Sequence, residues 1–240
     1  MDIRYLTDTF EREGLGLDTL IRRHPLLAPL FTRNFRGVSI DALRGAYLQL
    51  LKLKADYVQY TVPALRAAGE ALRGGDGEDR QWSAVFLDYA NGETDEAHPD
   101  GGNEDYGHHV WARNDMIALG APEELLAAPT DPTAVLYGQY FVEGAARHPY
   151  AVLGAKGVLE RFSLRVSDDL VGGLIDSGIP NAARATQFFE HHGVLDIDHV
   201  RQGDRNLAQL AAGPKRNQIL EGVYVTTGHY RALVHHLLPV

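Results

Sequence analysis

The chain has 240 residues, of which 45% are hydrophobic and 23% charged, a balance typical of globular rather than disordered proteins. Its net charge of −9 argues against a nucleic-acid groove or an anionic membrane surface, because both need clustered lysine and arginine. It contains no cysteine, which excludes a disulfide framework, a thiolate zinc site, an iron–sulfur cluster and a cysteine nucleophile.

The sequence also allows a prediction of the cellular compartment and of the number of domains. No segment approaches the roughly 20 consecutive apolar residues that cross a bilayer, and the N-terminal sequence lacks the apolar core of a secretion signal. We therefore expect a cytoplasmic protein. No repeat, low-complexity tract or linker divides the chain, so a single domain over residues 1–240 is predicted.

The first clear helical pattern follows Ser39, a suitable N-cap, and runs to residue 72 with apolar residues three and four positions apart. Pro63 is expected to bend or break this helix, because proline removes a backbone donor and clashes with the preceding turn. Further helical patterns cover residues 79–97, 103–119, 131–147, 149–166, 168–177, 181–212 and 215–238. No alternating strand pattern appears, so the sequence predicts an all-α bundle.

Glu104 and His108 lie four positions apart within one of these predicted helices. Side chains at this spacing can reach the same point in space, although such pairs also arise by chance on solvent-exposed faces. Nearby side chains of the same kinds are Asp105, His109 and Asp115. This pair is the first candidate for metal binding.

Two glutamates, Glu143 and Glu160, follow in an otherwise apolar setting. Their spacing places them on different sides of a straight helix, so only one is expected to face a shared site. A buried carboxylate needs a metal ion or a basic side chain as its partner.

The strongest local signal is FFEHHGVLDIDH, in which His192, Asp196 and His199 stand at positions i, i+4 and i+7. These three side chains point from one side of a helix. Two imidazoles and a carboxylate suit a hard-to-borderline metal such as Fe(II) or Mn(II). Gly193 weakens the helix at this point. Competing registers would use His191 and Asp198.

Three histidines and three carboxylates on three predicted helices form the kind of donor set that a di-iron bundle requires. The paired Glu-x-x-His motifs of ferritin-like proteins are missing. The pattern resembles the haem-oxygenase-like di-iron oxidases, relatives of haem oxygenase, of thiaminase II and of the PQQ-synthesis oxidase. The most specific part of this resemblance is the His-x-x-x-Asp-x-x-His motif, matched by His192, Asp196 and His199.

The resemblance also selects the other candidate ligands. The segment EDYGHHVW is similar to a family pattern of the form EExGHxxW, which selects Glu104 and His108. The remaining family carboxylate precedes the last motif at a spacing that Glu160 fits better than Glu143. The glutamate-to-histidine spacing varies in the family, so Glu104 has alternatives in Glu93, Glu96 and Asp105.

The resemblance implies a haem-oxygenase-like bundle that holds two irons per chain and uses dioxygen as co-substrate. One iron would take His108, Glu104 and Glu160, the other His192, Asp196 and His199, with Glu160 as a bridge. The implied reactions are N-oxygenation, desaturation or oxidative carbon–carbon cleavage of a small amino-acid-like or fatty-acid-like metabolite. Members often form homodimers, and in many of them the last ligand helix is mobile and the metals bind weakly.

Related activities fit less well. Haem oxygenase needs a histidine near the N-terminus, and the candidate His24 is followed directly by Pro25; thiaminase II uses a cysteine. Two alternatives stay open: a cofactor-free enzyme like the PQQ-synthesis oxidase, and a non-catalytic helical protein that binds a small molecule. Candidates for holding a substrate carboxylate are Arg161, Arg165 and Arg184, although a surface ion pair is the commoner role of such arginines. Candidates for lining a pocket are Phe86, Tyr89, Tyr137, Tyr140, Phe141, Phe188 and Phe189.

Overall fold

The computed structural model describes residues 2–97, 107–210 and 213–238. Within these ranges every regular element is a helix, which confirms the predicted all-α fold. The elements are α1 (Ile3–Arg22), α2 (Ala28–Thr32), α3 (Ile40–Val58), α4 (Thr61–Leu72), α5 (Gly77–Ala97), α6 (His109–Ala118), α7 (Glu123–Leu126), α8 (Pro132–Gly138), the π-helical turn η1 (Gln139–Glu143), α9 (Ala151–Asp176), the 3-10 turn η2 (Ala182–Arg184), α10 (Gln187–Ala208) and α11 (Pro214–Leu237).

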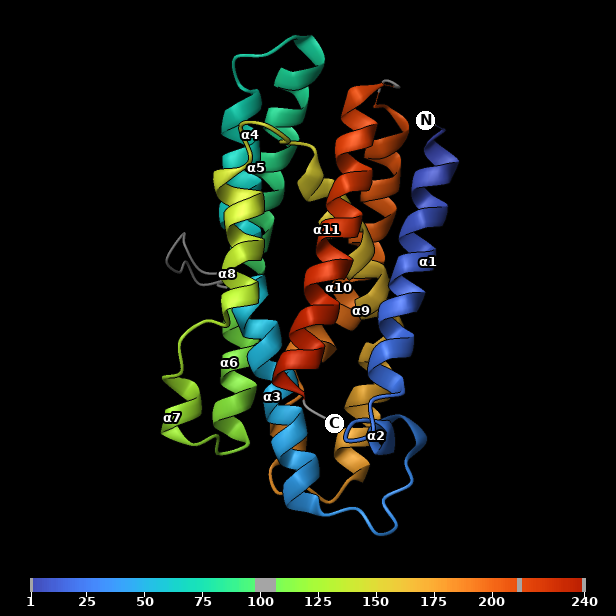
Figure 1. Ribbon diagram of the computed structural model, residues 1–240, viewed down its shortest axis with the longest axis vertical. Coiled ribbons are helices and arrows are strands. Elements are labelled where there is room, and N and C mark those ends of the chain that lie inside the picture. The colour runs from blue at the N-terminus through green and yellow to red at the C-terminus, as the bar shows by residue number, and fades with distance from the viewer. Residues whose placement is uncertain (1, 98–106, 211–212, 239–240) are drawn as a thin grey trace.

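The long helices form one bundle, elongated along a common direction (Figure 1). α9 packs against α1, α10 and α11, while α4 and α5 lie side by side on the other flank. α9 buries residues around most of its circumference, as expected of a helix that neighbours enclose. Each described helix is too short or too polar to span a membrane.

Pro63 interrupts the first predicted helix, as expected. α3 ends at Val58 and α4 begins at Thr61, so Pro63 lies in the first turn of α4, where a missing N–H costs little. The break falls at Gln59 and Tyr60, because Pro63 cannot donate the bond that would have gone to the Gln59 carbonyl.

Other boundaries differ from the predicted ones. The segments 149–166 and 168–177 form one continuous helix, α9. Ser167 lies inside it and is buried, and its hydroxyl donates to the Ser163 carbonyl over 2.9 Å, so the preceding turn satisfies its polar group. The N-terminal helix α1 was not predicted. Asp2 caps it by accepting a hydrogen bond from the Arg4 amide.

Glycines set the distance between α9 and α11. A Cβ atom added to Gly154 would lie 2.0 Å from the Ile219 carbonyl oxygen, and one added to Gly222 would lie 1.9 Å from the Ala151 carbonyl oxygen. The two backbones therefore touch at these points, which only glycine allows. This contact fixes the position of α9.

Candidate metal centre

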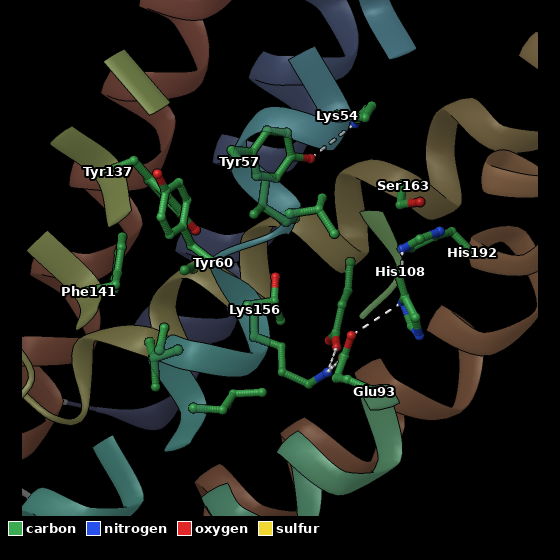
Figure 2. A pocket seen from close by; sticks show the side chains of 18 of the residues that line it. Lys54, Tyr57, Tyr60, Glu93, His108, Tyr137, Phe141, Lys156, Ser163 and His192 are labelled. Atoms are coloured by element: carbon green, nitrogen blue, oxygen red, sulfur yellow. Dashed lines mark hydrogen bonds and ion pairs between the residues drawn. The ribbon is translucent and has the colours of Figure 1, made fainter. Parts of the chain in front are cut away.

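Four helices bring carboxylate and imidazole groups together in the core of the bundle (Figure 2). α5 contributes a glutamate near its C-terminal end, the N-cap of α6 is a histidine, α9 contributes a lysine and a glutamate one turn apart, and α10 contributes a triad. The residues are Glu93, His108, Lys156, Glu160, His192, Asp196 and His199.

The first group joins α9 to α10. One ligand atom from each of Glu160, Asp196 and His199 can be chosen so that all three lie within 4.8 Å of one another. Nδ1 of His199 lies 3.3 Å from Oδ1 of Asp196 and 3.7 Å from Oε1 of Glu160. Both carboxylates are buried, whereas His199 is partly exposed. The three groups are close enough to contact one ion.

The second group centres on two imidazoles. Nδ1 of His108 lies 3.3 Å from Nε2 of His192 and 3.2 Å from Oε2 of Glu93. Nδ1 of His192 donates to the Phe188 carbonyl over 2.7 Å. Burial lowers the pKa of His192 to about 4, so its ring is neutral at neutral pH. Nε2 of His192 therefore carries a lone pair directed into the site, the state that a metal ligand needs.

Lys156 connects the two groups. Its ammonium lies 2.8 Å from Oε1 of Glu93 and 2.7 Å from Oε1 of Glu160. Burial lowers the pKa of Lys156, but the two carboxylates outweigh this effect and hold the pKa well above its usual range. The pKa of Glu93 is held well below its usual range by Lys156 and His108, against the effect of burial. The lysine is charged and has a carboxylate on each side.

The cluster nevertheless has fewer positive charges than carboxylates. Three carboxylates are buried, those of Glu93, Glu160 and Asp196, and the ammonium of Lys156 contacts two of them, Glu93 and Glu160. Oδ2 of Asp196 is buried and accepts no hydrogen bond from a described residue. Burial raises the pKa of Glu160 to about 7 although Lys156 lowers it, and the Asp196 carboxylate adds to the increase. Carboxylate oxygens and neutral imidazole nitrogens suit iron, so the residues fit such an ion.

The structure brings together the described members of the predicted ligand set. His108, Glu160, His192, Asp196 and His199 all lie in this cluster. Glu104 and its neighbour Asp105 lie outside the described residues. Beside His108 stands Glu93, one of the alternatives to Glu104.

Competing candidates lie elsewhere. Glu143 and Asp198 are exposed, as is His191, which stacks on Trp111. Asp115 accepts hydrogen bonds from the amides of Gln187 and Phe188 and so caps the start of α10. Lys156 was not predicted. A lysine one turn before a glutamate on α9 was the available signal, but such pairs are common on exposed helix faces.

A pocket with an empty volume of about 710 Å³, part of it open to solvent, adjoins the cluster. Its walls include the predicted aromatic residues Tyr137, Phe141 and Phe188 together with aliphatic side chains from α3, α4 and α9. The predicted arginines do not line it. Arg161 pairs with Glu11 and Asp204, Arg165 pairs with Glu11, and Arg184 is exposed.

The fold has a solved relative. A domain of unknown function with a haem oxygenase-like fold from Shewanella denitrificans superposes with a TM-score of 0.69 at 14% sequence identity, covering 99% of this chain and 90% of its own. This likeness confirms the haem-oxygenase-like bundle that the sequence predicted. No curated protein matches the chain significantly.

A family of iron-containing redox enzymes matches residues 92–228. The matched region is more than half of the chain and contains all the cluster residues from Glu93 to His199. The family's iron agrees with the imidazole and carboxylate donors of the cluster. The chain therefore belongs to the family of iron-containing redox enzymes.

Proposed function

We propose that this oxidoreductase is a non-haem di-iron oxidase or oxygenase that activates dioxygen and acts on a small amino-acid-like or fatty-acid-like metabolite. The observation that carries the proposal is the convergence of three buried carboxylates and three imidazoles on four helices, beside a pocket with many aliphatic and aromatic side chains. Membership of an iron-containing redox family supports it.

The two groups of side chains suggest two ions. Glu160, Asp196 and His199 would hold one, and His108 and His192 with Glu93 would hold the other. In this assignment Glu93 replaces Glu104, the residue predicted from the sequence, as the carboxylate ligand that accompanies His108. Glu160 belongs to the first group and is linked to the second through Lys156, which contacts both Glu160 and Glu93.

Bound ferrous iron would supply the electrons that reduce dioxygen. The protein itself supplies the negative charge around the ions and the orientation of their ligands. The carboxylates keep the net charge of the buried centre low, and the Phe188 carbonyl fixes the ring of His192 with Nε2 turned inward. The aliphatic and aromatic part of the pocket wall disfavours water beside the centre.

Anaerobic titration with Fe(II) tests the proposal. We expect two irons per chain and stoichiometric consumption of dioxygen when the loaded protein is exposed to air. Asp196→Asn should lower the stoichiometry, whereas Asp198→Asn, an exposed change on the same helix, should leave it at two. Binding of no more than one iron, or equal behaviour of the two variants, would contradict a di-iron centre at this place.

One observation favours a metal-free alternative. The ammonium of Lys156 already neutralises part of the charge on Glu93 and Glu160, as a cofactor-free oxidase or a non-catalytic small-molecule binder would require. The same iron titration distinguishes the di-iron enzyme from both alternatives, because a cofactor-free oxidase and a non-catalytic binder would take up no iron specifically.

A further inference from the structure

Lys54 is a buried ammonium that forms no ion pair with a described carboxylate, although the negative charge of Asp196 acts on it electrostatically. It lies on α3, and 2% of its surface is exposed. Its hydrogen-bond partner is the hydroxyl of Tyr57, 3.2 Å from Nζ, and no described carboxylate forms an ion pair with it. Burying an ammonium in this way is costly, and buried lysines are almost always paired.

Aromatic rings surround this ammonium. Nζ lies 4.4 Å from the ring centre of Phe162, 5.0 Å from that of Tyr230, 5.7 Å from that of Phe189 and 5.8 Å from that of Phe188. Cation–π contacts offset part of the lost hydration, but not all of it. Burial lowers the pKa of Lys54 to about 7, and the Asp196 carboxylate offsets only part of this effect.

Lys54 also lines the pocket beside the metal centre. In Figure 2, Lys54 and Tyr57 lie on one side of the pocket, away from Lys156 and Glu93 on the other. Aliphatic and aromatic side chains form much of the remaining lining. They include Val58, Leu65, Tyr137, Phe141, Val152 and Leu159.

The pocket therefore has two lysines in different states. Lys156 has carboxylates on both sides, whereas Lys54 has a hydroxyl and aromatic rings. Of the two lysines that line the pocket, Lys54 is the one that forms no ion pair with a described carboxylate. A ligand with one anionic end and an apolar body matches this distribution of charge.

We propose that Lys54 and the hydroxyl of Tyr57 bind the carboxylate of the substrate, and that the substrate is a simple monocarboxylic acid whose apolar body lies along the pocket toward the metal centre. The inference rests on the proposed function, because it places a substrate beside the proposed iron site. It narrows the substrate class from amino-acid-like or fatty-acid-like molecules to fatty-acid-like ones.

Two arguments favour a plain carboxylate. An α-amino acid would bring its own ammonium next to Lys54, and the carboxylate that acts on Lys54 electrostatically, that of Asp196, forms no ion pair with it that would offset the repulsion. A phosphate carries more charge and is usually held by several donors or a helix N-terminus, whereas this place offers one ammonium and one hydroxyl.

Calorimetric titration of the iron-free, chelator-treated protein at pH 7 tests the inference without any turnover. The probes are octanoate, octanamide and 2-aminooctanoate, which share chain length and differ in charge. Octanoate should bind about 10- to 100-fold more tightly than octanamide, the range expected of a charged hydrogen bond. It should also bind more tightly than 2-aminooctanoate.

Lys54→Met removes the charge with little change of shape and should abolish the preference for octanoate over octanamide. Tyr57→Phe is a second variant and should reduce that preference by less. Lys215→Met, which removes a lysine paired with Glu78 and Asp79 and absent from the pocket lining, should retain it. Near-ultraviolet circular dichroism establishes that each variant is folded.

An equal affinity of the unmodified protein for octanoate and octanamide would overturn the inference, as would a Lys54→Met protein that still prefers octanoate. Tighter binding of 2-aminooctanoate would overturn the restriction to simple acids. Iron titration of Lys54→Met is expected to give the unmodified stoichiometry. Octanoate binding that depends on Lys54, in a protein that takes up no iron, would sink the proposed oxidase while leaving the carboxylate site in place.

Discussion

Nδ1 of His108 lies 3.3 Å from Nε2 of His192, although 84 residues separate them in the sequence. The two rings meet edge to face, with an interplanar angle of 88°. Trp111 stacks on the ring of His108, and the Phe188 carbonyl accepts the Nδ1 proton of His192. Both imidazoles are thus oriented by groups on their own helices, and the packing of α6 against α10 brings them together.

Replacing His192 tests this orientation. His192→Ala should weaken ferrous iron binding at least ~10-fold, because it removes a neutral imidazole whose Nε2 faces the site. Asp198→Ala is the control, since Asp198 is an exposed residue of the same helix and its replacement should leave the affinity unchanged. Anaerobic equilibrium titration measures both. An equal loss of iron affinity in the two variants would contradict the assignment of His192 as a ligand on α10.

Lys156 is expected to compete with the metal. Lys156→Met removes the ammonium between Glu93 and Glu160, so the iron-free protein should lose roughly 3–5 kcal/mol of unfolding free energy, the usual cost of breaking a buried ion pair. Iron should then raise the melting temperature of the variant more than that of the unmodified protein, because both carboxylates are available to the ion.

Thermal unfolding with and without Fe(II) under argon measures this difference. Lys215→Met serves as control, because its ion pairs with Glu78 and Asp79 lie outside the cluster. An iron-dependent increase in melting temperature that is the same in Lys156→Met and in the unmodified protein would show that Lys156 does not occupy a metal position.

The stability of the iron-free protein should depend on the titration of Lys54. Burial lowers the pKa of this lysine from 10.5 to about 7. Between these values the unfolded chain keeps a proton that the folded protein has lost, so the unfolding free energy rises with pH across the window. The contribution is fully present above pH 10.5 and is lost as the pH falls toward 7.

Urea unfolding at pH 6.5, 8 and 9.5 measures this dependence. The unfolding free energy of the unmodified protein should rise with pH relative to that of Lys54→Met, by on the order of a few kcal/mol over this range. The pKa of Tyr57 and of Tyr230 is raised well above its usual value by burial, so these neighbours stay protonated in this range. A constant difference would show that Lys54 does not titrate within it.

The glycine contact between α9 and α11 should be intolerant of a methyl group. Gly222→Ala is expected to cost at least about 2 kcal/mol, because its Cβ would overlap the Ala151 carbonyl and force the helices apart. Gly228→Ala on the same helix meets no atom within 4 Å and should stabilise the protein by up to ~1 kcal/mol. Urea midpoints compare the two. Similar midpoints for both variants would mean that α9 and α11 are less tightly packed.

Several features of this protein were determined locally and could be predicted from the sequence. Helical periodicity and the break before Pro63 depend on hydrogen bonds within one or two turns. The placement of His192, Asp196 and His199 on one face of α10 follows from the geometry of a single helix. Together with the family pattern, these local signals were enough to predict an all-α bundle and most of the cluster.

Only the tertiary structure decided which distant groups meet. Glu93 stands beside His108, and Lys156 lies between Glu93 and Glu160, because α5, α6 and α9 pack in one particular way. Lys54 falls within a helical pattern that does not reveal its aromatic surroundings. Arg161, one of the candidates for holding substrate, instead forms ion pairs, the alternative role that its residue type allows. Charge and burial at such positions depend on contacts between helices far apart in sequence, which no local spacing encodes.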